Sequence, residues 1–500
     1  MANNSPESPL PRLLTEGEDC WRVTRAQRAA LIVDAENYYR CALDALLEAR
    51  SQIILVGWDI DTRVRLAADH PSGAPTALGP LLSWLARRRP ELRIYVLAWD
   101  EGVLSVPFRG TTMFRMLKWR LDDHVTIKWD SSHPLAASHH QKMLVIDDNM
   151  AFCGGIDITA DRWDTRHHRD REPLRKRPFT RRDYHPWHDA TMAVDGGTAR
   201  ALGELARLRW KIATGDQLPE PDVSDDPWPS ALEPDFRHVP VAIARTRGHE
   251  HKVSEVREIE ALFLNLIRTA RRTVYFETQY FASRVVAEAI AKRLQEPDGP
   301  EFVVVNPRSA QGWLQEAVMG PARSQLLDAI AARDPHQRFR IYTPVTEAGA
   351  DIYVHAKIMI ADNSFLRVGS ANLNNRSMGL DSECDLLIDA REDEAARRRI
   401  DTLRADLLAE HLGREPGEVA AGIARTGSII QTIEALRGEG RTLAPFEPPR
   451  FGTVKTGLAL SELLDPEGPG ELFEPRARPG LLSRMGRRRR APLAAKGERG

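Results

Sequence analysis

The sequence predicts an α/β fold made of two related halves. Short apolar runs with strand character alternate with segments of helical periodicity, and a histidine–lysine–aspartate motif occurs twice at a wide spacing. Strands separated by helices are typical of α/β architecture. At 500 residues the chain is also too long for one compact core, which favours two or three domains.

The first half shows this alternation from residue 34 onward. Apolar positions recur at helical spacing over 34–50, and the short apolar run 53–56 that follows is typical of a buried strand. The same patterns predict, in order, helix 77–88, strand 92–98, a helix–strand pair over 111–129 and strand 143–146. Residues 1–30 are polar at the start and are predicted to form an N-terminal extension, so we expect a first domain over 31–214.

Residues 215–240 are rich in proline and aspartate without periodicity, which predicts a linker over 215–250. A second domain is expected over 251–415. Its predicted elements are helix 253–271, strand 274–276, helix 284–295, strand 302–305, helix 310–333, strands 339–342 and 358–360, and helix 395–412. Residues 416–500 are predicted to hold one helix near 417–437 and then, from about 440, an irregular arginine-rich tail.

Composition excludes several classes of protein. With 70 basic and 71 acidic residues the net charge is −1, which argues against a surface devoted to nucleic acid. The four cysteines lie in no short metal-binding spacing and are too few for a disulfide framework, so a reducing compartment is expected. No apolar run is long enough for a transmembrane helix, and the N-terminal residues do not resemble a signal peptide.

An internal repeat carries the chemistry. His140, Lys142 and Asp147 recur as His355, Lys357 and Asp362, each 215 residues later. The same offset relates three downstream pairs: Gly154 and Gly369, Gly155 and Ser370, and Asp157 and Asn372. One such histidine–lysine–aspartate match is expected by chance on the order of 0.02 times in a chain of this length, so two at one offset indicate duplication.

The residue types point to phosphoryl chemistry. Histidine and lysine alternate in each motif, so on a strand they share one face. The small residues at Gly155 and Ser370 let the backbone approach a ligand. Two motifs brought together by a pseudo-twofold axis supply two ammonium groups for phosphate oxygens and two imidazoles for attack and protonation. The symmetry leaves the roles of His140 and His355 interchangeable.

The paired motifs resemble those of the phospholipase D superfamily. The similarity extends to GGIDITADRWD and PWHD in the first half and to VYFETQYF and GSANLNNRSMG in the second, and it covers about 30–415. It implies two tandem phospholipase D-like α-β-α sandwich domains that share one active site. By the same resemblance, His140 is the nucleophile that forms a phosphohistidine, and His355 is the general acid and base.

The remaining site residues follow from the same comparison. Lys142, Lys357 and Asn372 are expected to hold phosphoryl oxygens, with Asp157 at the position that matches Asn372. Asp147 and Asp362 complete the catalytic motifs, where we expect them to orient the site rather than react. Three further candidates are Glu383, as a partner for a histidine, and Trp187 and His188, as pocket-wall or packing residues. Because neighbours on a strand face opposite ways, His188 and Asp189 are not expected to form a dyad. No metal or other cofactor is expected, because the lysines supply positive charge and no ligand cluster is evident.

Residues 162–182 carry nine basic side chains. They form either a solvated loop or a rim beside the site that faces an anionic bilayer, where each is worth about 1 kcal/mol. The four arginines of 487–490 allow the same two interpretations: a solvated tail or a membrane tether.

The resemblance implies a phospholipase D that hydrolyses glycerophospholipid headgroups to phosphatidic acid and can transfer the phosphatidyl group to an alcohol. A cardiolipin or phosphatidylserine synthase is the alternative, and a nuclease is less favoured. The expected partner is phospholipid at a membrane surface, with no nucleic acid and no obligate protein partner. The expected location is the cytoplasm, at the periphery of the inner membrane face.

Overall fold

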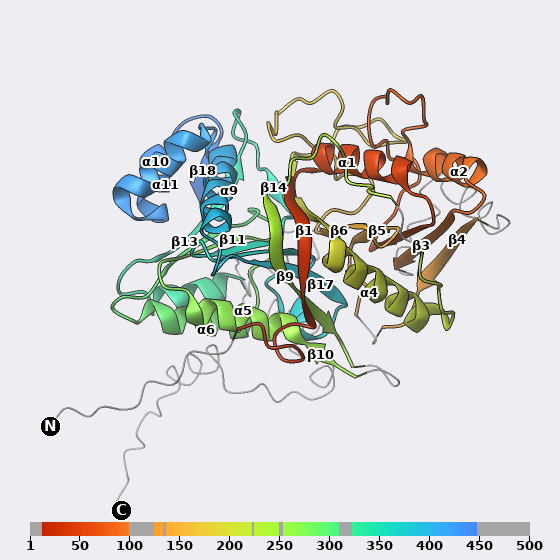
Figure 1. Ribbon diagram of the computed structural model, residues 1–500. Helices are drawn as coiled ribbons and strands as arrows, with labels where there is room; N and C mark the ends of the chain where they lie inside the picture. Colours follow the sequence, from red (N-terminus) through yellow and green to blue (C-terminus); the bar gives the residue numbers. More distant parts are fainter. Residues whose placement is uncertain are drawn as a thin grey trace, which may run out of the picture.

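The computed structural model describes residues 13–99, 124–133, 137–222, 225–249, 254–309 and 323–447. Within these ranges a 16-stranded sheet runs through both halves of the molecule (Figure 1). The predicted α/β class is confirmed. The two halves, however, share one sheet instead of each having a sheet of its own.

The first half supplies one arm of this sheet. Its elements, in chain order, are β1 (Arg22–Val33), α1 (Ala35–Glu48), β2 (Gln52–Gly57), α2 (Leu78–Arg88), β3 (Arg93–Trp99), β4 (Val125–Asp130), β5 (Met143–Ile146), β6 (Met150–Gly154), β7 (Trp187–His188), β8 (Ala190–Asp195) and α4 (Gly196–Thr214).

The second half supplies the other arm. Its elements are β9 (Phe236–Arg247), β10 (Val256–Arg257), α5 (Glu258–Thr269), β11 (Thr273–Glu277), α6 (Arg284–Leu294), β12 (Glu301–Val305), β13 (Phe339–Val345), β14 (Tyr353–Val354), β15 (Ile358–Ala361), β16 (Phe365–Gly369), α8 (Asn375–Gly379), β17 (Glu383–Asp389), α9 (Glu394–Leu412), α10 (Pro416–Thr426), α11 (Ile429–Leu436) and β18 (Thr442–Pro445).

The strand order is symmetric about the adjacent pair β1 and β9. Outward from β1 it runs β8, β6, β5, β2, β3, β4, and outward from β9 it runs β17, β16, β15, β11, β12, β13. In both arms the pairing is antiparallel as far as β2 or β11 and parallel from there to β4 or β13. The second arm has one further strand, β18, which pairs antiparallel with β13. The sequence repeat is therefore a pseudo-twofold repeat of structure.

Helices cover both faces of the sheet, as Figure 1 shows: α1 and α2 lie above it and α4 below it in the first half, whereas α5 and α6 lie below and α9 above in the second. Successive side chains of a strand point to opposite faces of the sheet, so one strand packs against the helices of both layers. Leu43 of α1 and Leu82 of α2 share a core with Ile53, whereas Leu202 of α4 shares a core with Ile54, the next residue on β2. This burial on both faces explains why the strands read as continuous apolar runs.

Two expected boundaries are wrong. The predicted N-terminal extension 1–30 contains most of β1, and the predicted linker 215–250 contains β9. These two 12-residue strands pair with each other at the centre of the sheet and join its two arms. Both strands contain a short apolar run, but an arginine adjoins each run and a polar stretch precedes each strand, so they resemble connecting segments when they are considered without their partners.

The C-terminal region also differs from expectation. The helix expected over 417–437 is two helices, because Gly427 adopts a left-handed φ of 67° that ends α10, and Ser428 then caps α11. β18 pairs with β13 inside the segment predicted to be irregular. The arginine run 487–490, most of the expected helix within 111–129 and part of the expected helix 310–333 lie outside the described residues.

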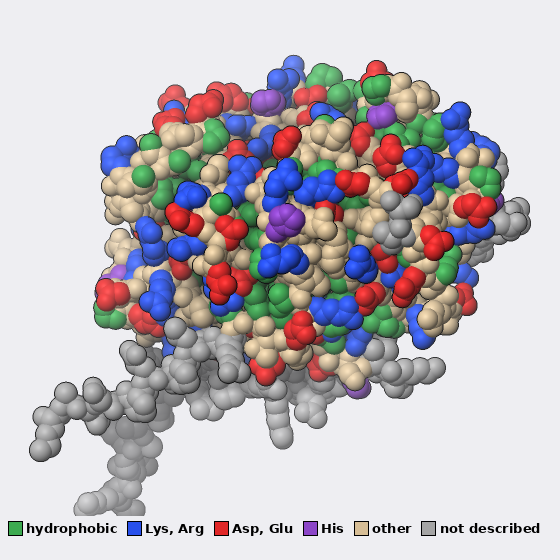
Figure 2. Space-filling model, in the orientation of Figure 1, with side chains coloured by type: hydrophobic (Ala, Val, Ile, Leu, Met, Phe, Trp, Pro, Cys, Tyr) green, Lys and Arg blue, Asp and Glu red, His purple; other side chains and the backbone are tan. Residues whose placement is uncertain are grey.

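Two expectations about the whole chain can be checked on the described residues. The four cysteines, all within them, are unpaired. No helix there has the length and apolar character needed to cross a bilayer. On the face that Figure 2 shows, acidic and basic side chains are interspersed.

Candidate active site

The two histidine–lysine segments lie directly before β5 and β15, and each accepts support from the backbone of the other half. The His140 N–H donates to the Ser382 carbonyl (3.0 Å), and the His355 N–H donates to the His188 carbonyl (2.7 Å). Parallel pairing of β14 with β7 extends the second contact. The candidate site therefore lies at the junction of the halves, as the repeat predicts.

Each imidazole has a carboxylate partner from the opposite half. His140 Nδ1 lies 3.0 Å from both oxygens of Glu383, and His355 Nδ1 lies 2.6 Å from Asp189 Oδ2. Glu383 also accepts hydrogen bonds from the hydroxyls of Ser370 and Ser377. With Nδ1 bound to a carboxylate in each case, Nε2 is the nitrogen that can attack or transfer a proton.

Asp189 is a functional residue that sequence reasoning missed. It directly precedes β8, and Glu383 begins β17, the corresponding strand of the other arm. Asp189 follows Asp157 by 32 residues, but Glu383 follows Asn372 by only 11, so a longer loop in the first half conceals the correspondence. A search for an acid directly before the matching strand would have found it.

Each lysine side chain folds back toward the backbone of the histidine in its own motif. Lys142 Nζ donates to the His140 carbonyl at 2.9 Å and lies 3.3 Å from Asp157 Oδ2. Lys357 Nζ donates to the His355 carbonyl and lies 3.5 Å from Gln279 Oε1. The first lysine thus has an acid beside it where the second has an amide, which makes the two halves electrostatically unequal.

Burial and the neighbouring cations set the protonation of these groups. Burial lowers the pKa of His140 and of His355 well below the usual range, and the charges of both lysines lower them further. Burial also lowers the pKa of Lys357 to about 7, against the opposing effect of Asp189. The imidazoles are therefore neutral near pH 7, which is the form that a nucleophile needs.

A third cation, Arg162, adds to the positive charge around His355. Its guanidinium lies 4.2 Å from the ring centroid of Trp187, and its charge helps to lower the pKa of His355. Trp187 in turn stacks on Tyr353 (4.7 Å) and lies 5.1 Å from the His355 ring. Trp187 and Tyr353 also line a cavity of about 320 Å³. The prediction that Trp187 lines a pocket fits this arrangement.

The small and amide residues of the repeat also lie at the site. A side chain at Gly155 would place its Cβ 2.2 Å from Asp189 Oδ1 and 3.2 Å from Lys357 Cδ, so only glycine fits there. Asn372 is buried, and its Oδ1 has no hydrogen-bond partner among the described residues. An unpaired polar atom in a buried site is available to a ligand.

Asp147 and Asp362 do not face the histidines, although they belong to the motifs. They follow β5 and β15, at the opposite ends of these strands from the histidines. Asp147 accepts three backbone N–H bonds from 50–52, at 2.6–2.8 Å. Asp362 accepts three from 271–273, at 2.7–3.0 Å. These carboxylates hold the turns before β2 and β11. Their position fits the expectation that they do not react, but they do not orient the histidines directly.

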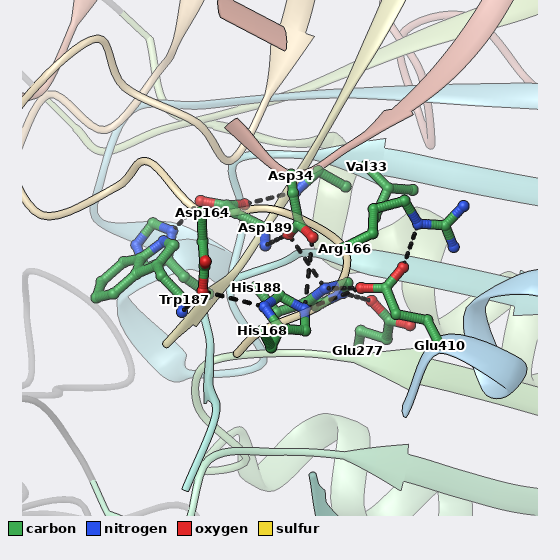
Figure 3. A network of polar contacts seen from close by, with 12 residues as sticks. Val33, Asp34, Asp164, Arg166, His168, Trp187, His188, Asp189, Glu277 and Glu410 are labelled. Atoms are coloured by element: carbon green, nitrogen blue, oxygen red, sulfur yellow. Dashed lines mark hydrogen bonds and ion pairs between the residues drawn. The ribbon is translucent and has the colours of Figure 1, made fainter. Parts of the chain in front are cut away.

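Of the two roles expected of His188, pocket wall or packing, its fully buried ring fits packing, because it does not line the cavity beside Trp187. Its Nε2 lies 2.7 Å from Glu277 Oε2, within a network behind the site (Figure 3). The alternation along β7 explains this: Trp187 faces the cavity, and the next side chain must face away from it. Asp189 does not pair with His188, as expected.

The basic stretch 162–182 is partly neutralised by acids. Arg175 is bonded to Asp164, Arg166 to Asp406 and Glu410, and Lys176 to Asp183. Its exposed basic residues are Arg169, Arg171, Arg177, Arg181 and Arg182. The idea of a continuous cationic rim is therefore too strong, and the cation of this stretch that acts on the site is Arg162.

Comparisons with known proteins agree with the geometry. A family model described as "Phospholipase D" matches residues 45–227, and one described as "Cardiolipin synthase, PLD-like domain" matches residues 263–403. Each match contains one histidine–lysine motif. The two halves of the repeat are thus recognised separately.

Among curated proteins, "Phospholipase D A" of Dictyostelium discoideum is 23% identical over 77% of this chain and 36% of its own length. "Phospholipase D alpha 4" of Arabidopsis thaliana is 22% identical over 81% of this chain and 66% of its own length. The chain thus spans between about a third and two thirds of the length of these relatives. A solved phosphatidylserine synthase of Haemophilus influenzae Rd KW20 superposes with a TM-score of 0.52 at 11% identity, covering 83% of this chain and 96% of its own, which establishes a shared fold.

Proposed function

This chain belongs to the phospholipase D superfamily, and from that premise we propose that it hydrolyses the headgroup phosphodiester of a glycerophospholipid to phosphatidic acid. The observation that carries the proposal is the reciprocal pairing at the junction: His140 with Glu383 and His355 with Asp189, each imidazole held by a carboxylate of the other half. Such a pair can attack phosphorus and protonate the departing alcohol at the same centre.

In the proposed first step, His140 Nε2 attacks phosphorus, and the bond from phosphorus to the headgroup oxygen breaks. His355 Nε2 gives its proton to that oxygen. The negative phosphate of the bound lipid favours the protonated form of His355, which burial and the lysines otherwise disfavour. Lys142, Lys357 and Asn372 hold the non-bridging oxygens, where charge develops.

In the second step His355 removes a proton from water, the water oxygen attacks phosphorus, and the phosphorus–nitrogen bond to His140 breaks. Phosphatidic acid leaves, and both imidazoles return to their starting state. An alcohol in place of water gives a phosphatidyl alcohol from the same intermediate. Hydrolysis and transfer are thus two outcomes of one site.

An exposed loop with apolar and cationic side chains supports a lipid substrate. Between β6 and β7 the chain exposes 63% of Leu174 and 67% of Phe179, beside the exposed arginines Arg171 and Arg181. Large apolar side chains flanked by cations are suited to the interface of an anionic bilayer. The same loop carries Arg177 and Tyr184, which line the cavity next to Trp187. Lipid bound at this loop would have its headgroup close to the histidines.

The test is a product assay with phosphatidylcholine vesicles in the presence and absence of ethanol. Phosphatidic acid as the main product supports hydrolysis, and phosphatidylethanol with little phosphatidic acid supports the alternative of a phosphatidyltransferase. Single-stranded DNA serves as the competing phosphodiester. Cleavage of DNA without turnover of lipid would overturn the proposal.

The pH dependence of this reaction should reflect the loss of the proton from the Lys357 ammonium. Its pKa of about 7 in the free enzyme means that the ammonium is charged below that pH and is lost above it. We expect kcat/KM to fall on the alkaline side of pH 7, because the neutral amine binds phosphate less well. A bound phosphate stabilises the ammonium, so the alkaline limb of kcat should lie at higher pH than that of kcat/KM. If the alkaline limbs of kcat and kcat/KM coincide, or if the alkaline limb of kcat/KM does not move in Lys357→Arg, this assignment is wrong.

A further inference from the structure

A cluster of buried acids and imidazoles lies directly behind the candidate active site (Figure 3). Asp34 follows β1, His168 lies in the loop between β6 and β7, His188 is in β7, and Glu410 is near the end of α9. All four are buried. We propose that these four side chains bind one divalent cation of the Zn²⁺ class, as a structural site that joins the two halves.

The spacing of the four side chains fits a metal ion. His168 Nε2 lies 3.0 Å from Glu410 Oε1 and 3.4 Å from Asp34 Oδ2. His188 Nδ1 lies 2.9 Å from the same Glu410 oxygen and 3.3 Å from Asp34 Oδ1. Tetrahedral ligands at zinc distances are about 3.3 Å apart. The four groups can all offer atoms within 4.8 Å of one another.

Two of these atoms lack hydrogen bonds although they are buried. Asp34 Oδ2 and His188 Nδ1 have no hydrogen-bond partner among the described residues. Asp34 Oδ1, in contrast, accepts the Asp189 N–H at 3.1 Å. Both atoms lie close to titratable neighbours, but neither has a hydrogen bond, so each can offer a lone pair to a common cation.

The outer contacts are those that metal-binding histidines make. Such a histidine donates its other ring N–H to a carboxylate or carbonyl, which fixes the tautomer that binds the ion. His168 Nδ1 lies 3.1 Å from Asp164 Oδ2, and His188 Nε2 lies 2.7 Å from Glu277 Oε2. Both imidazoles therefore direct their remaining nitrogen to the same point. Arg175 binds Asp164, and the Tyr275 hydroxyl binds Glu277, so the outer layer is itself held in place.

With neutral imidazoles, the cluster needs two further positive charges. It contains two arginine contacts, Arg175 to Asp164 and Arg166 to Glu410. Arg441 lies farther out, where it binds the backbone carbonyls of Arg166 and His167. The carboxylates exceed the arginine partners by two in this set: Asp34, Asp164, Glu277 and Glu410. One divalent cation, or two protons on the imidazoles, would supply the missing charge, and buried charge requires such compensation.

The position of the site gives it a structural consequence. Three ligands come from the first half and one from α9 of the second, so an ion would clamp the halves together. The Asp34 N–H donates to the Asp189 carbonyl, and the Asp189 N–H donates to Asp34 Oδ1, so the cluster contacts the partner of His355 directly. Four protein ligands without an open position are typical of structural sites and not of catalytic ones. The sequence indicated no ligand cluster, whereas the structure brings these four side chains together. The sequence could not reveal the cluster, because its residues are 20 to 376 positions apart.

The first experiment measures metal in the full-length chain, purified without a polyhistidine tag. We expect elemental analysis to give close to one zinc per chain. Dialysis against a chelator should lower the thermal midpoint, and Zn²⁺ should restore it. Co²⁺ added to the chelated protein should give the visible absorption of a tetrahedral site. If neither Zn²⁺, Co²⁺ nor Mn²⁺ binds or shifts the midpoint, protonated histidines balance the charge and the proposal is wrong.

Matched variants locate the ion. His168→Gln and Asp34→Asn should each weaken zinc binding by at least about tenfold. His70→Gln, which removes an imidazole bonded to Asp44 at the surface, should leave binding unchanged. His140→Ala is the second control, because paired catalytic imidazoles can also bind zinc. Metal lost in His140→Ala but retained in His168→Gln would place the ion in the active site and overturn the proposal. These readouts do not depend on lipid turnover.

Discussion

His140→Ala should lower kcat for lipid hydrolysis by about 10⁴-fold or more, the loss expected when a nucleophile is removed. Without Nε2 there is no phosphohistidine, and water must attack the diester directly. The measurement is steady-state turnover of phosphatidylcholine, with trapping of acid-labile phosphate on the protein. Thermal unfolding should change little, because the His140 side chain is 15% exposed and Glu383 keeps the hydroxyls of Ser370 and Ser377 as partners.

His355→Ala gives the contrasting result. Its overall loss should be similar, but a substrate with a p-nitrophenol leaving group, which needs no protonation, should restore the first step. Phosphoenzyme should then accumulate, because no base activates water for the second step. Trapped phosphate on His355 in the His140 variant, or rescue of His140→Ala by the activated substrate, would reverse the assigned roles. His70→Gln serves as the control for loss of a histidine elsewhere.

Asp189→Asn should have the next largest effect, a loss of about 10²- to 10⁴-fold in kcat with little change in KM, as for the aspartate that orients a catalytic histidine. Its carboxylate lies 2.6 Å from His355 Nδ1 and fixes the tautomer that presents Nε2 to the substrate. Because Asp189 acts through His355, the activated leaving group should rescue this variant in the first step, and phosphoenzyme should accumulate.

Glu383→Gln is the matched variant at the symmetric position. It removes the charge beside His140, so it should slow the attack on phosphorus. The activated substrate should rescue it less than Asp189→Asn, and no phosphoenzyme should accumulate. Equal rescue of the two variants would show that the carboxylates only hold the fold, and each should therefore be compared with wild type by thermal unfolding.

Much of the site was predictable from local sequence. The constant offset of 215 residues identified both histidines, both lysines and the small residues after them. Glu383 was expected to bind a histidine, and it binds His140. Apolar runs gave β2, β3, β5, β11, β12 and β15 to within about three residues, because strands buried on both faces have no polar alternation to obscure them. β1 and β9 were missed because an arginine adjoins each of their short apolar runs and a polar stretch precedes each strand.

Tertiary structure decided which residues work together. The motif aspartates Asp147 and Asp362 lie at the far strand ends, whereas Asp189, outside any motif, binds His355. A motif is defined by spacing along one stretch of chain. A carboxylate that comes from the other half of the chain has no fixed spacing to the histidine that it binds.

The sequence by itself therefore determined the family, the duplicated half-sites and their imidazoles and ammonium groups. Only the folded chain determined the partners of those groups, the lowered pKa of Lys357 and the buried cluster of Asp34, His168, His188 and Glu410. The physical reason is that residue identity is a local property, whereas burial, charge balance and cross-half contacts arise when the two arms of the sheet join at β1 and β9.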